Sequence, residues 1–547
     1  MPAYALALTL LVTGPLLRPG YLLLRDAVST PRSYLTDAAL GLTEAAPRAL
    51  PQDFAVAVAS HVVDGGVVVK LLLIAGLWAA AWGAARLVDV VVPAAGVPGQ
   101  FVAATVAGWN PYVAERLLQG HWSLLVGYGA LPWVAVAVLR LRDGRGHPWA
   151  LLFWIAAAGL TPTGLMLAAV VAVVTCAGPG SGWSRWRCAA WSLGAAVLGA
   201  LPWLVAPLLA GSLRMSEVAG VPQFAARAEP GLGTLLSLAG LGGIWNGQAV
   251  PASRTTAFAV VATVVLLGIV ALGLPAALRW PAARPLLVLA AVAVIAPALM
   301  ATGPGLAAVE ALTRAVPGLG VLRDGQKWVA LALPGYAVAG ASIVVVLRRR
   351  VPGIATAAVC SLALLAVLPD LAWGVGCRVT SVSYPAGWTA AAALIDADPR
   401  PVAVLPGASM RHFSWAGPAP VLDPLPRWVA ADVLTTGDLV IGGQVVPGEG
   451  RRARDVERLV GSGAGVDELA AAGVGWVVVE GRDAPRLGLP VALAEDDLVV
   501  YRVGGDHRGA PHRGVMIAAH LAWLAALVAG AAGTIATAVT RRRRGAV

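Results

Sequence analysis

The sequence predicts a mainly α-helical, polytopic membrane protein with one α/β domain inserted before its last helix. Only 13% of the 547 residues are charged, whereas soluble domains carry about 25%. The apolar residues gather in runs long enough to cross a bilayer, which takes about 20 residues as a helix. One long polar stretch, residues 373–513, interrupts this pattern before the final apolar run. These observations exclude an ordinary soluble fold.

About twelve apolar runs are predicted to be transmembrane helices. They are residues 3–24, 66–87, 97–113, 122–139, 149–161, 162–177, 189–210, 255–276, 285–302, 328–347, 352–372 and 514–538. Residues 149–177 leave the count open, because Thr161-Pro162-Thr163 separates either two short helices or the halves of one kinked helix. The first run has no basic region before it and no convincing cleavage site after it, so we expect it to be retained as a helix.

Arginine clusters between the runs predict the topology, because cytoplasmic loops carry an excess of Lys and Arg. With a cytoplasmic N-terminus and alternate crossings, five clusters fall on the cytoplasmic side. They are Arg140, Arg142 and Arg145; Arg185 and Arg187; Arg279 and Arg284; Arg348, Arg349 and Arg350; and Arg541 to Arg544. We therefore expect a multi-pass protein of the cytoplasmic membrane with both termini in the cytoplasm. The net charge of +11 then reflects topology and does not indicate a nucleic-acid partner.

The same alternation divides the chain into three parts. Residues 1–372 form a transmembrane core with outer loops at 25–65, 211–254 and 303–327. Residues 373–513 form an extracytoplasmic domain, and residues 514–547 form the last helix and a basic cytoplasmic tail.

The extracytoplasmic domain is predicted to be of the α/β type. Its sequence contains three short strand-like runs, at residues 402–405, 474–479 and 498–503, and a helix-like segment at 456–472. The domain contains no phosphate-binding P-loop, dinucleotide-binding glycine motif or serine nucleophile elbow.

Three groups of charged residues at the outer membrane edge are candidates for function, because charges are costly to place there. The first is Arg25-Asp26, directly after the first run. The Asp26 carboxylate could act as a general base on an acceptor hydroxyl or bind a divalent metal ion. The alternative is an ordinary solvated helix end.

The second group is Glu115 and Arg116 with His121 in the loop before the fourth run, and a capped structural loop is its alternative. The third is Arg323, Asp324 and Lys327 at the outer end of the tenth run. A helix N-terminus favours an anion, and the two cations would add charge-assisted contacts to a phosphate. Cations that extend toward the interface are the alternative.

Several short motifs, in this order, resemble the GT-C superfamily of membrane glycosyltransferases. The first loop has Asp26 followed by Pro31-Arg32-Ser33-Tyr34-Leu35, and Asn110-Pro111 precedes Pro132-Trp133. Arg323 to Lys327 precedes Leu333-Pro334. The chain is most similar to the arabinofuranosyltransferases of mycobacterial cell-wall synthesis. The polar domain is also similar to that of related polytopic proteins, at Tyr384-Pro385 with Trp388, Leu405-Pro406, Trp415, Asp423-Pro424 and residues 472–479.

The resemblance implies an actinobacterial cell-envelope enzyme that takes a sugar, arabinofuranosyl or mannosyl, from a polyprenyl-phosphate donor. It implies a glycan or glycolipid acceptor at the outer face of the bilayer. Asp26 would be the catalytic carboxylate, and Arg323 and Lys327 would hold the donor phosphate. Many GT-C enzymes use a second acid, for which Asp37 and Asp53 are the candidates. A requirement for Mg, Mn or Ca stays open.

Two other classes of function remain. A transporter or flippase would favour charges in mid-membrane and internal repeats, and neither is evident in the sequence. A non-catalytic protein that binds lipid-linked glycans would fit the lack of a paired acid next to Asp26.

Overall fold

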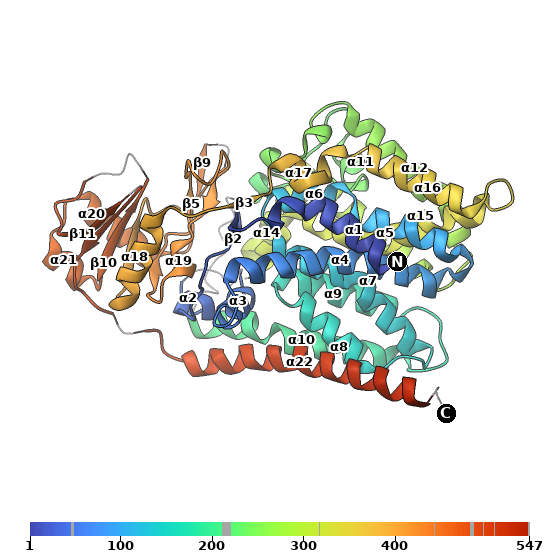
Figure 1. Ribbon diagram of the computed structural model, residues 1–547, viewed down its shortest axis with the longest axis horizontal. Helices are drawn as coiled ribbons and strands as arrows, with labels where there is room; N and C mark the ends of the chain where they lie inside the picture. The colour runs from blue at the N-terminus through green and yellow to red at the C-terminus, as the bar shows by residue number, and fades with distance from the viewer. Residues whose placement is uncertain are drawn as a thin grey trace.

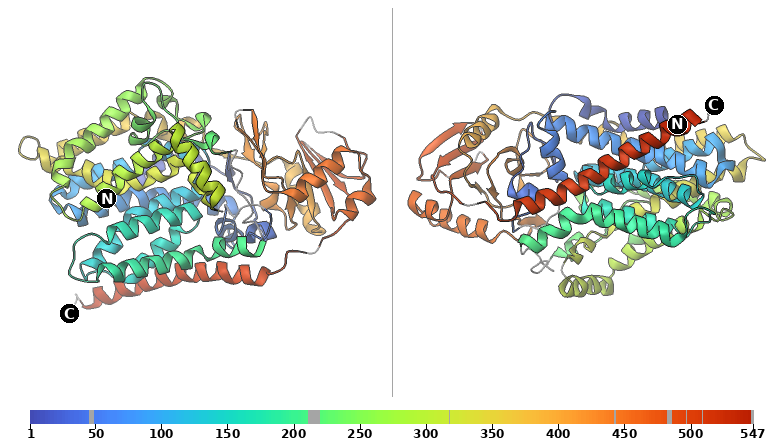
Figure 2. Two further views of the ribbon diagram at one scale, coloured as in Figure 1. Left: turned by 180° about the vertical axis from the view of Figure 1, so that it is seen from behind. Right: turned by 90° about the horizontal axis from the view of Figure 1, so that it is seen from below.

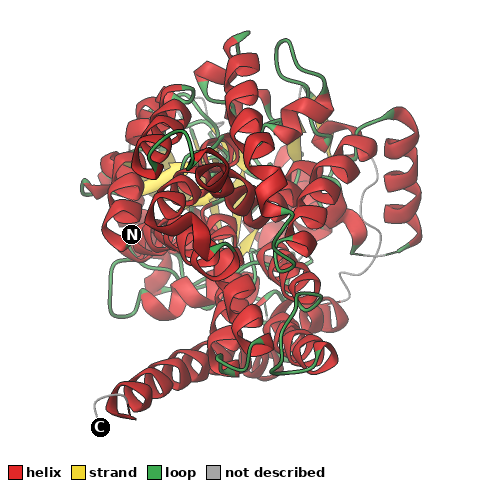
Figure 3. Ribbon diagram, turned by 90° about the vertical axis from the view of Figure 1, so that its right-hand side faces the viewer, coloured by secondary structure: helices red, strands yellow, loops and turns green. Residues whose placement is uncertain are grey.

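The computed structural model describes residues 1–544 except 45–48, 211–219, 317, 442, 482–485, 496 and 508. A large body of helices occupies one end of the molecule, and a smaller sheet domain occupies the other (Figure 1). Both ends of the chain lie in the helical part, away from the sheet domain. Figure 3 shows the molecule from the helical end, with the helices in front of the strands.

Each of the twelve predicted runs contains a helix. The helices are α1 (Pro2–Thr13), α4 (Gly65–Val91), α5 (Gly96–Gly108), α7 (Trp122–Arg142), α8 (Pro148–Ala158), α9 (Pro162–Thr175), α10 (Arg185–Ala210), α12 (Phe258–Ala277), α13 (Arg284–Met300), α15 (Leu333–Leu347), α16 (Gly353–Ala366) and α22 (Arg513–Arg544). The structure also shows how many helices residues 149–177 form. They form two helices, α8 and α9, because the Thr161 side chain caps a new helix by accepting from the Gly164 N–H at 3.0 Å.

The predicted count of twelve spans is not confirmed. Among the described residues, six helices are long and apolar enough to cross a membrane, or up to eight if each of two bent pairs is one span. The bent pairs are α13 with α14 (Gly303–Ala315), at 91°, and residues 353–366 with 369–377, at 75°. The reason is length. A helix of 11 to 14 residues, such as α8 or α9, rises about 1.5 Å per residue and does not reach across a core of about 30 Å.

The first run is shorter as a helix than predicted. The α-helix ends at Thr13, a 3₁₀ turn covers Gly14–Leu17, and the chain then enters strand β1 (Tyr21–Leu24). Gly20 makes this switch with a φ of +110°, and a Cβ there would lie 2.6 Å from the Val382 carbonyl oxygen. The close approach allows β1 to pair with β3 (Ser381–Val382) of the polar region.

Two elements of the loop at residues 25–65 are short helices. They are α2 (Asp37–Leu40) and α3 (Gln52–Ala59). The first of them is a single turn, which ends at Gly41 with a φ of +78°.

The sheet domain has the predicted α/β composition. Five strands lie in the order β11-β12-β10-β4-β7, with β4 parallel to both β10 and β7, and β12 antiparallel to β10 and β11. The strands are β4 (Val402–Leu405), β7 (Val433–Leu434), β10 (Trp476–Glu480), β11 (Val491–Glu495) and β12 (Leu498–Arg502). The predicted helix 456–472 is two helices, α20 (Arg451–Gly461) and α21 (Val466–Ala471), separated by Gly463 and Gly465.

Other elements complete the domain. They are helices α18 (Ala386–Ala397) and α19 (Leu425–Trp428) and the hairpins β5–β6 (Met410–Arg411, Val421–Leu422) and β8–β9 (Leu439–Ile441, Gln444–Val446). The last helix, α22, leaves the domain and runs along the outside of the helical body (Figures 1 and 2). Its Trp523 indole N–H donates to the Ala156 carbonyl of α8 at 2.9 Å.

A polar cluster fastens the sheet domain to the helical body. The Asp37 backbone N–H donates to the Asp432 carboxylate at 2.7 Å, and Arg513 at the start of α22 pairs with the Asp37 side chain. The cluster therefore joins the first loop, the sheet domain and the last helix. Burial and the nearby Asp37 carboxylate raise the pKa of Asp432 to about 6.

This cluster predicts a pH-dependent stability. Because the folded-state pKa of Asp432 lies above its ordinary value near 4, the folded protein binds a proton that the unfolded chain lacks between about pH 4 and 6. Stability should therefore rise as the pH falls through 6 toward 4, by up to about 3 kcal/mol. Asp432→Asn should remove this rise and stabilise the protein at pH 7. The thermal unfolding midpoint of the detergent-purified chain at pH 7 and pH 5 measures both effects.

Asp455→Asn is the matched control, because Asp455 is exposed and pairs with Arg458 on its own helix. It should leave the pH dependence unchanged. An Asp432→Asn protein with the wild-type pH dependence would contradict the assignment.

Candidate active site

Asp26 lies at the tip of a tight hairpin. Strand β1 and strand β2 (Ala27–Val28) pair antiparallel, with Leu24 opposite Ala27, so Arg25 and Asp26 form a two-residue turn. Arg25 takes the left-handed conformation, with a φ of +50°, as the first position of the commonest tight hairpin turns requires. The turn directs the Asp26 side chain toward the segment that joins two helices of the body, α6 (Pro111–Leu118) and α7.

Gly120 lets this hairpin pack directly on the α6–α7 connection. It has a φ of +83°, and a Cβ there would lie 2.3 Å from both the Ala27 nitrogen and the Leu24 carbonyl oxygen. The Asp26 backbone N–H also donates to the Gln119 carbonyl at 3.2 Å. Backbone contacts thus fix the position of Asp26 independently of the bonds that its side chain makes.

Two side chains hold the Asp26 carboxylate. Nε2 of His121 and Nε2 of Gln119 lie 2.9 and 3.0 Å from the same oxygen, Oδ2. Burial on its own raises the pKa of Asp26, but the bonds from His121 and Gln119 outweigh it and hold the pKa below its ordinary value. The Asp26 side chain is nevertheless 35% exposed. An ionised carboxylate therefore faces solvent at this site.

His121 connects Asp26 to a buried ion pair. Arg116 approaches Nδ1 of His121 at 3.0 Å and makes two bonds to the Asp324 carboxylate, at 2.7 and 2.9 Å. Because a guanidinium can only donate, Nδ1 of His121 accepts, and the Nε2 proton points at Asp26. Burial lowers the pKa of His121, and Asp26 offsets this only in part. We infer a neutral imidazole that donates to Asp26.

The Arg116–Asp324 pair is itself enclosed. The Arg116 side chain is fully buried and that of Asp324 is 7% exposed. Although burial raises the pKa of Asp324, the charges of Arg116 and Lys327 hold it well below its usual range. The site therefore contains two fixed charges, the Arg116 cation and the Asp324 anion.

Glu115 belongs to the support of the site and does not reach Asp26. It accepts the backbone N–H groups of Gly243 and Ile244 at 3.2 and 3.1 Å, and the Gln326 amide at 3.1 Å. Burial, followed by the nearby Glu229 carboxylate, raises the pKa of Glu115 well above its ordinary range. Its role is to hold residues 243–244 against α6.

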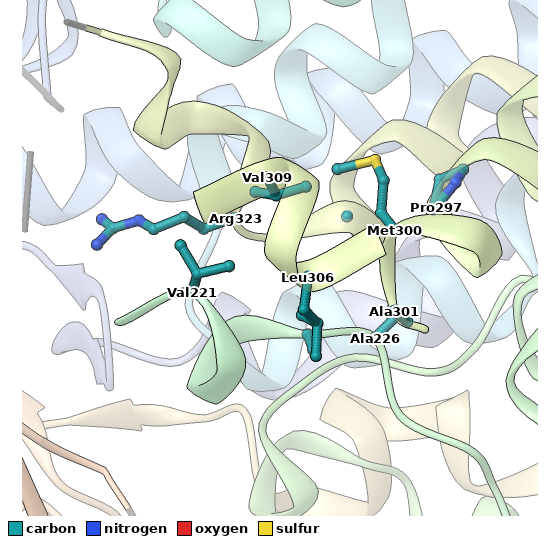
Figure 4. A pocket seen from close by; sticks show the side chains of 10 residues that line it. Val221, Ala226, Pro297, Met300, Ala301, Leu306, Val309 and Arg323 are labelled. Atoms are coloured by element: carbon teal, nitrogen blue, oxygen red, sulfur yellow. The ribbon is translucent and has the colours of Figure 1, made fainter. Parts of the chain in front are cut away.

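The two residues predicted to bind phosphate, Lys327 and Arg323, contact different side chains. Nζ of Lys327 is 3.8 Å from the Asp324 carboxylate, and its charge also acts on Asp26 from a greater distance. Arg323 instead packs over the Phe224 ring, 5.1 Å from its centroid. Its aliphatic chain borders a small pocket lined by apolar side chains of the α13–α14 bend and of residues 221–226, and its guanidinium points away from the other labelled side chains (Figure 4). The pocket residues include Val221, Pro297, Met300, Leu306 and Val309.

The two candidates for a second acid have other partners. Asp37 belongs to the cluster with Asp432 and Arg513, and Asp53 pairs with Arg427 at 3.1 Å. Within the described residues neither shares a hydrogen-bond partner with Asp26. The described residues also contain no group of three or more His, Cys, Asp or Glu side chains placed to hold a metal ion.

The structure adds residues that the sequence did not single out. Gln119, Gln326 and Asn246 are amides without a distinguishing motif, yet each bonds to the site. Gln119 holds Asp26, Asn246 donates to the Gln119 side chain at 2.8 Å, and Gln326 joins Arg116 to Glu115. Of these, only Gln119 and Gln326 had a sequence signal, since each lies within two residues of a predicted site residue.

Comparison with known proteins identifies the fold. No protein-family model and no curated protein match the chain. Among solved structures, the chain is similar to the cryo-EM structure of the arabinofuranosyltransferase AftD from mycobacteria, with a TM-score of 0.55 and 20% identity over 93% of this chain and 40% of that chain. A variant of the same enzyme gives a TM-score of 0.54 at 20% identity, over 92% of this chain and 42% of that one.

The chain therefore has a GT-C fold, as the sequence motifs predicted. It is similar in particular to mycobacterial AftD, although it spans less than half of that protein's length.

The packing of the hairpin on Gly120 predicts a large effect of one added methyl group. In Gly120→Ala, the new Cβ sits on a left-handed residue and also clashes with backbone atoms of the hairpin. The control is Gly463→Ala, because Gly463 has a similar φ of +80° but a Cβ there would have no atom within 4 Å. The control should lose about 1 to 2 kcal/mol from conformation alone. Gly120→Ala should lose clearly more, measured by thermal unfolding in detergent. Equal losses would show that the hairpin does not pack on this glycine.

Proposed function

We propose that the protein is a membrane glycosyltransferase. It moves a sugar, arabinofuranosyl or mannosyl, from a polyprenyl-phosphate donor to a glycan or glycolipid acceptor of the cell envelope. The observation that carries the proposal is the ionised, solvent-facing Asp26 carboxylate, held by His121 beside the Lys327 cation. The GT-C fold supports the same class of reaction.

The residues support a direct transfer. Asp26 takes the proton of an acceptor hydroxyl as that oxygen bonds to the anomeric carbon of the donor sugar. The bond between the anomeric carbon and the phosphate oxygen breaks, and its electron pair leaves with the polyprenyl phosphate. Lys327 faces the negative charge of this leaving group, with Arg323 as a second cation near the pocket at the α13–α14 bend. His121 keeps Asp26 oriented and ionised.

The membrane orientation follows from the same proposal. The cytoplasmic side carries both termini and the arginine clusters, and the opposite side carries Asp26 and the sheet domain. The position of both chain ends in the helical body, away from the sheet domain, supports this arrangement (Figure 1). The sheet domain then faces the envelope and contributes to the binding of the acceptor.

Removal of the Asp26 carboxylate is predicted to abolish most of the transfer. Asp26→Asn keeps the shape of the side chain but cannot accept a proton, and general-base catalysis contributes about 10²–10⁴-fold. The rate of sugar transfer from a polyprenyl-phosphate donor should therefore fall by about that factor. The control is Asp53→Asn, whose carboxylate pairs with Arg427, and it should keep most of the activity.

Comparable losses in the two variants would make Asp53 part of the machinery and would count against a single base. An active, folded Asp26→Asn protein would exclude the proposed mechanism.

The cations are predicted to act on donor affinity to different degrees. Lys327→Gln removes the charge nearest Asp26, and a hydrogen bond to a charged group is worth about 1.5–3 kcal/mol. The KM for the donor should therefore rise about tenfold or more. Arg323→Gln should have a smaller effect, because its guanidinium packs on Phe224. Initial-rate kinetics with the donor varied measures both, and a larger effect of Arg323→Gln would reverse the assignment.

A further inference from the structure

Three arginines converge on one short segment next to the Asp26 site. The segment is residues 246–250, which includes a 3₁₀ turn, Gly247–Ala249. Arg25 comes from the β1–β2 hairpin, Arg227 from the loop that precedes α11 (Thr234–Ala239), and Arg378 from the residues after α17 (Ala372–Cys377). Side chains from three distant parts of the sequence thus carry positive charge to the same place.

Two of these side chains bind the same carbonyl group. Arg25 donates to the Gln248 carbonyl oxygen at 3.1 Å, and Arg378 donates to that oxygen and to the Val250 carbonyl at 2.8 Å. Arg25 also donates to the Leu118 carbonyl at 2.6 Å. Two guanidinium groups on one oxygen lie close together, although like charges repel.

The third arginine lies beside the turn. A Cβ built on Gly247 would lie 3.9 Å from both Cζ and Nε of Arg227. The Arg227 backbone is held by a bond to the Gly243 carbonyl, at 2.9 Å. Arg227 therefore completes a cationic rim around the solvent-exposed residues Gly247 and Gln248.

Within the described chain, the carboxylates of Asp26, Asp370 and Glu229 act on this rim only from a distance and form no direct contact with it. None of the three arginines takes part in an ion pair there, and Nε of both Arg25 and Arg227 is buried without a hydrogen-bond partner. Arg25 is 4% exposed, whereas Arg378 is open to solvent. Burial, followed by the charge of Arg378, lowers the pKa of Arg25 to about 10, so it remains a cation at neutral pH. A buried polar donor without a partner is costly, and an anion would satisfy it.

We propose that Arg25, Arg227 and Arg378 form an anion-binding site for a phosphoryl group, on residues separate from Lys327. Guanidinium groups match the geometry of phosphate oxygens, and three of them supply donors from several directions. The phosphoryl group is that of a lipid headgroup or of free phosphate, which share this chemistry.

The site is joined to Asp26 by one hydrogen-bonded link. Asn246, at the start of the segment, donates to the Gln119 side chain at 2.8 Å, and Gln119 donates to Asp26. If the proposed transferase function holds, an anion bound here lies one side-chain link, Asn246 to Gln119, from the catalytic carboxylate. The binding itself does not depend on that function.

The test is a binding measurement that needs no turnover. The full-length protein in nonionic detergent is titrated with inorganic phosphate by calorimetry, and its bound phosphatidylglycerol and phosphatidylcholine are counted by native mass spectrometry. Arg378→Gln and Arg227→Gln should each weaken phosphate-anion binding about tenfold or more. Arg349→Gln, which removes the same charge from an exposed turn on the predicted cytoplasmic side, is the matched control and should bind as the wild type does.

The two arms distinguish the source of the anion. Binding of inorganic phosphate that the rim variants lose supports a free-phosphate site. Selective retention of phosphatidylglycerol, lost in the same variants, supports a lipid headgroup. Absence of binding in both arms, or equal loss in Arg349→Gln, overturns the proposal. Arg378→Lys keeps the charge, so its partial recovery of binding separates a charge effect from misfolding.

An Asp26→Asn protein separates this proposal from the transferase function. It should lose transfer and bind the anion normally. Normal transfer in Asp26→Asn together with loss of binding in Arg378→Gln would reject the mechanism and keep the anion site.

Discussion

The site depends on the buried ion pair between Arg116 and Asp324. It connects α6 to the segment that leads into α15, and its two parallel hydrogen bonds fix the guanidinium plane. That plane sets the acceptor role of His121 at Nδ1, and through it the proton that His121 presents to Asp26. The loss of one partner of such a pair leaves a buried charge, which costs about 3–5 kcal/mol. The pair is therefore a constraint on geometry more than a source of net stability.

Packing around this pair fixes the position of the Asp26 carboxylate. Gly120 brings the hairpin backbone against the α6–α7 connection, and Glu115 holds the 243–244 segment on the other side of α6. Three loops that are far apart in the sequence thus meet at one point. Asp26 remains partly open to solvent while its partners are enclosed, which is the combination that a base acting on an external substrate needs.

Sequence patterns predicted the helices well, because hydrophobic runs report directly on burial in lipid or protein. They predicted Asp26, His121, Arg116, Asp324 and Lys327 as candidates, but in three separate groups. They form one site because Arg116 contacts Asp324, which lies 208 positions away in the sequence, and no local pattern encodes such a contact. The pairing of Asp37 with Arg513 and the packing of Arg323 on Phe224 could not be predicted for the same reason. Helix length was overestimated where glycine and proline end a helix early, as after Thr13.

In the proposed mechanism, Asp26 and Lys327 face the reacting bond of one bound donor. The most direct test of this mechanism is a cryo-EM structure of the full-length chain with a phosphonate analogue of a polyprenyl-phosphate sugar, which cannot react. We expect the phosphonate oxygens at Lys327 and room for an acceptor oxygen between the anomeric carbon and Asp26, at a reacting distance of about 3–3.5 Å. A sugar bound away from the β1–β2 hairpin, with Asp26 still hydrogen-bonded to His121 and out of its reach, would contradict it.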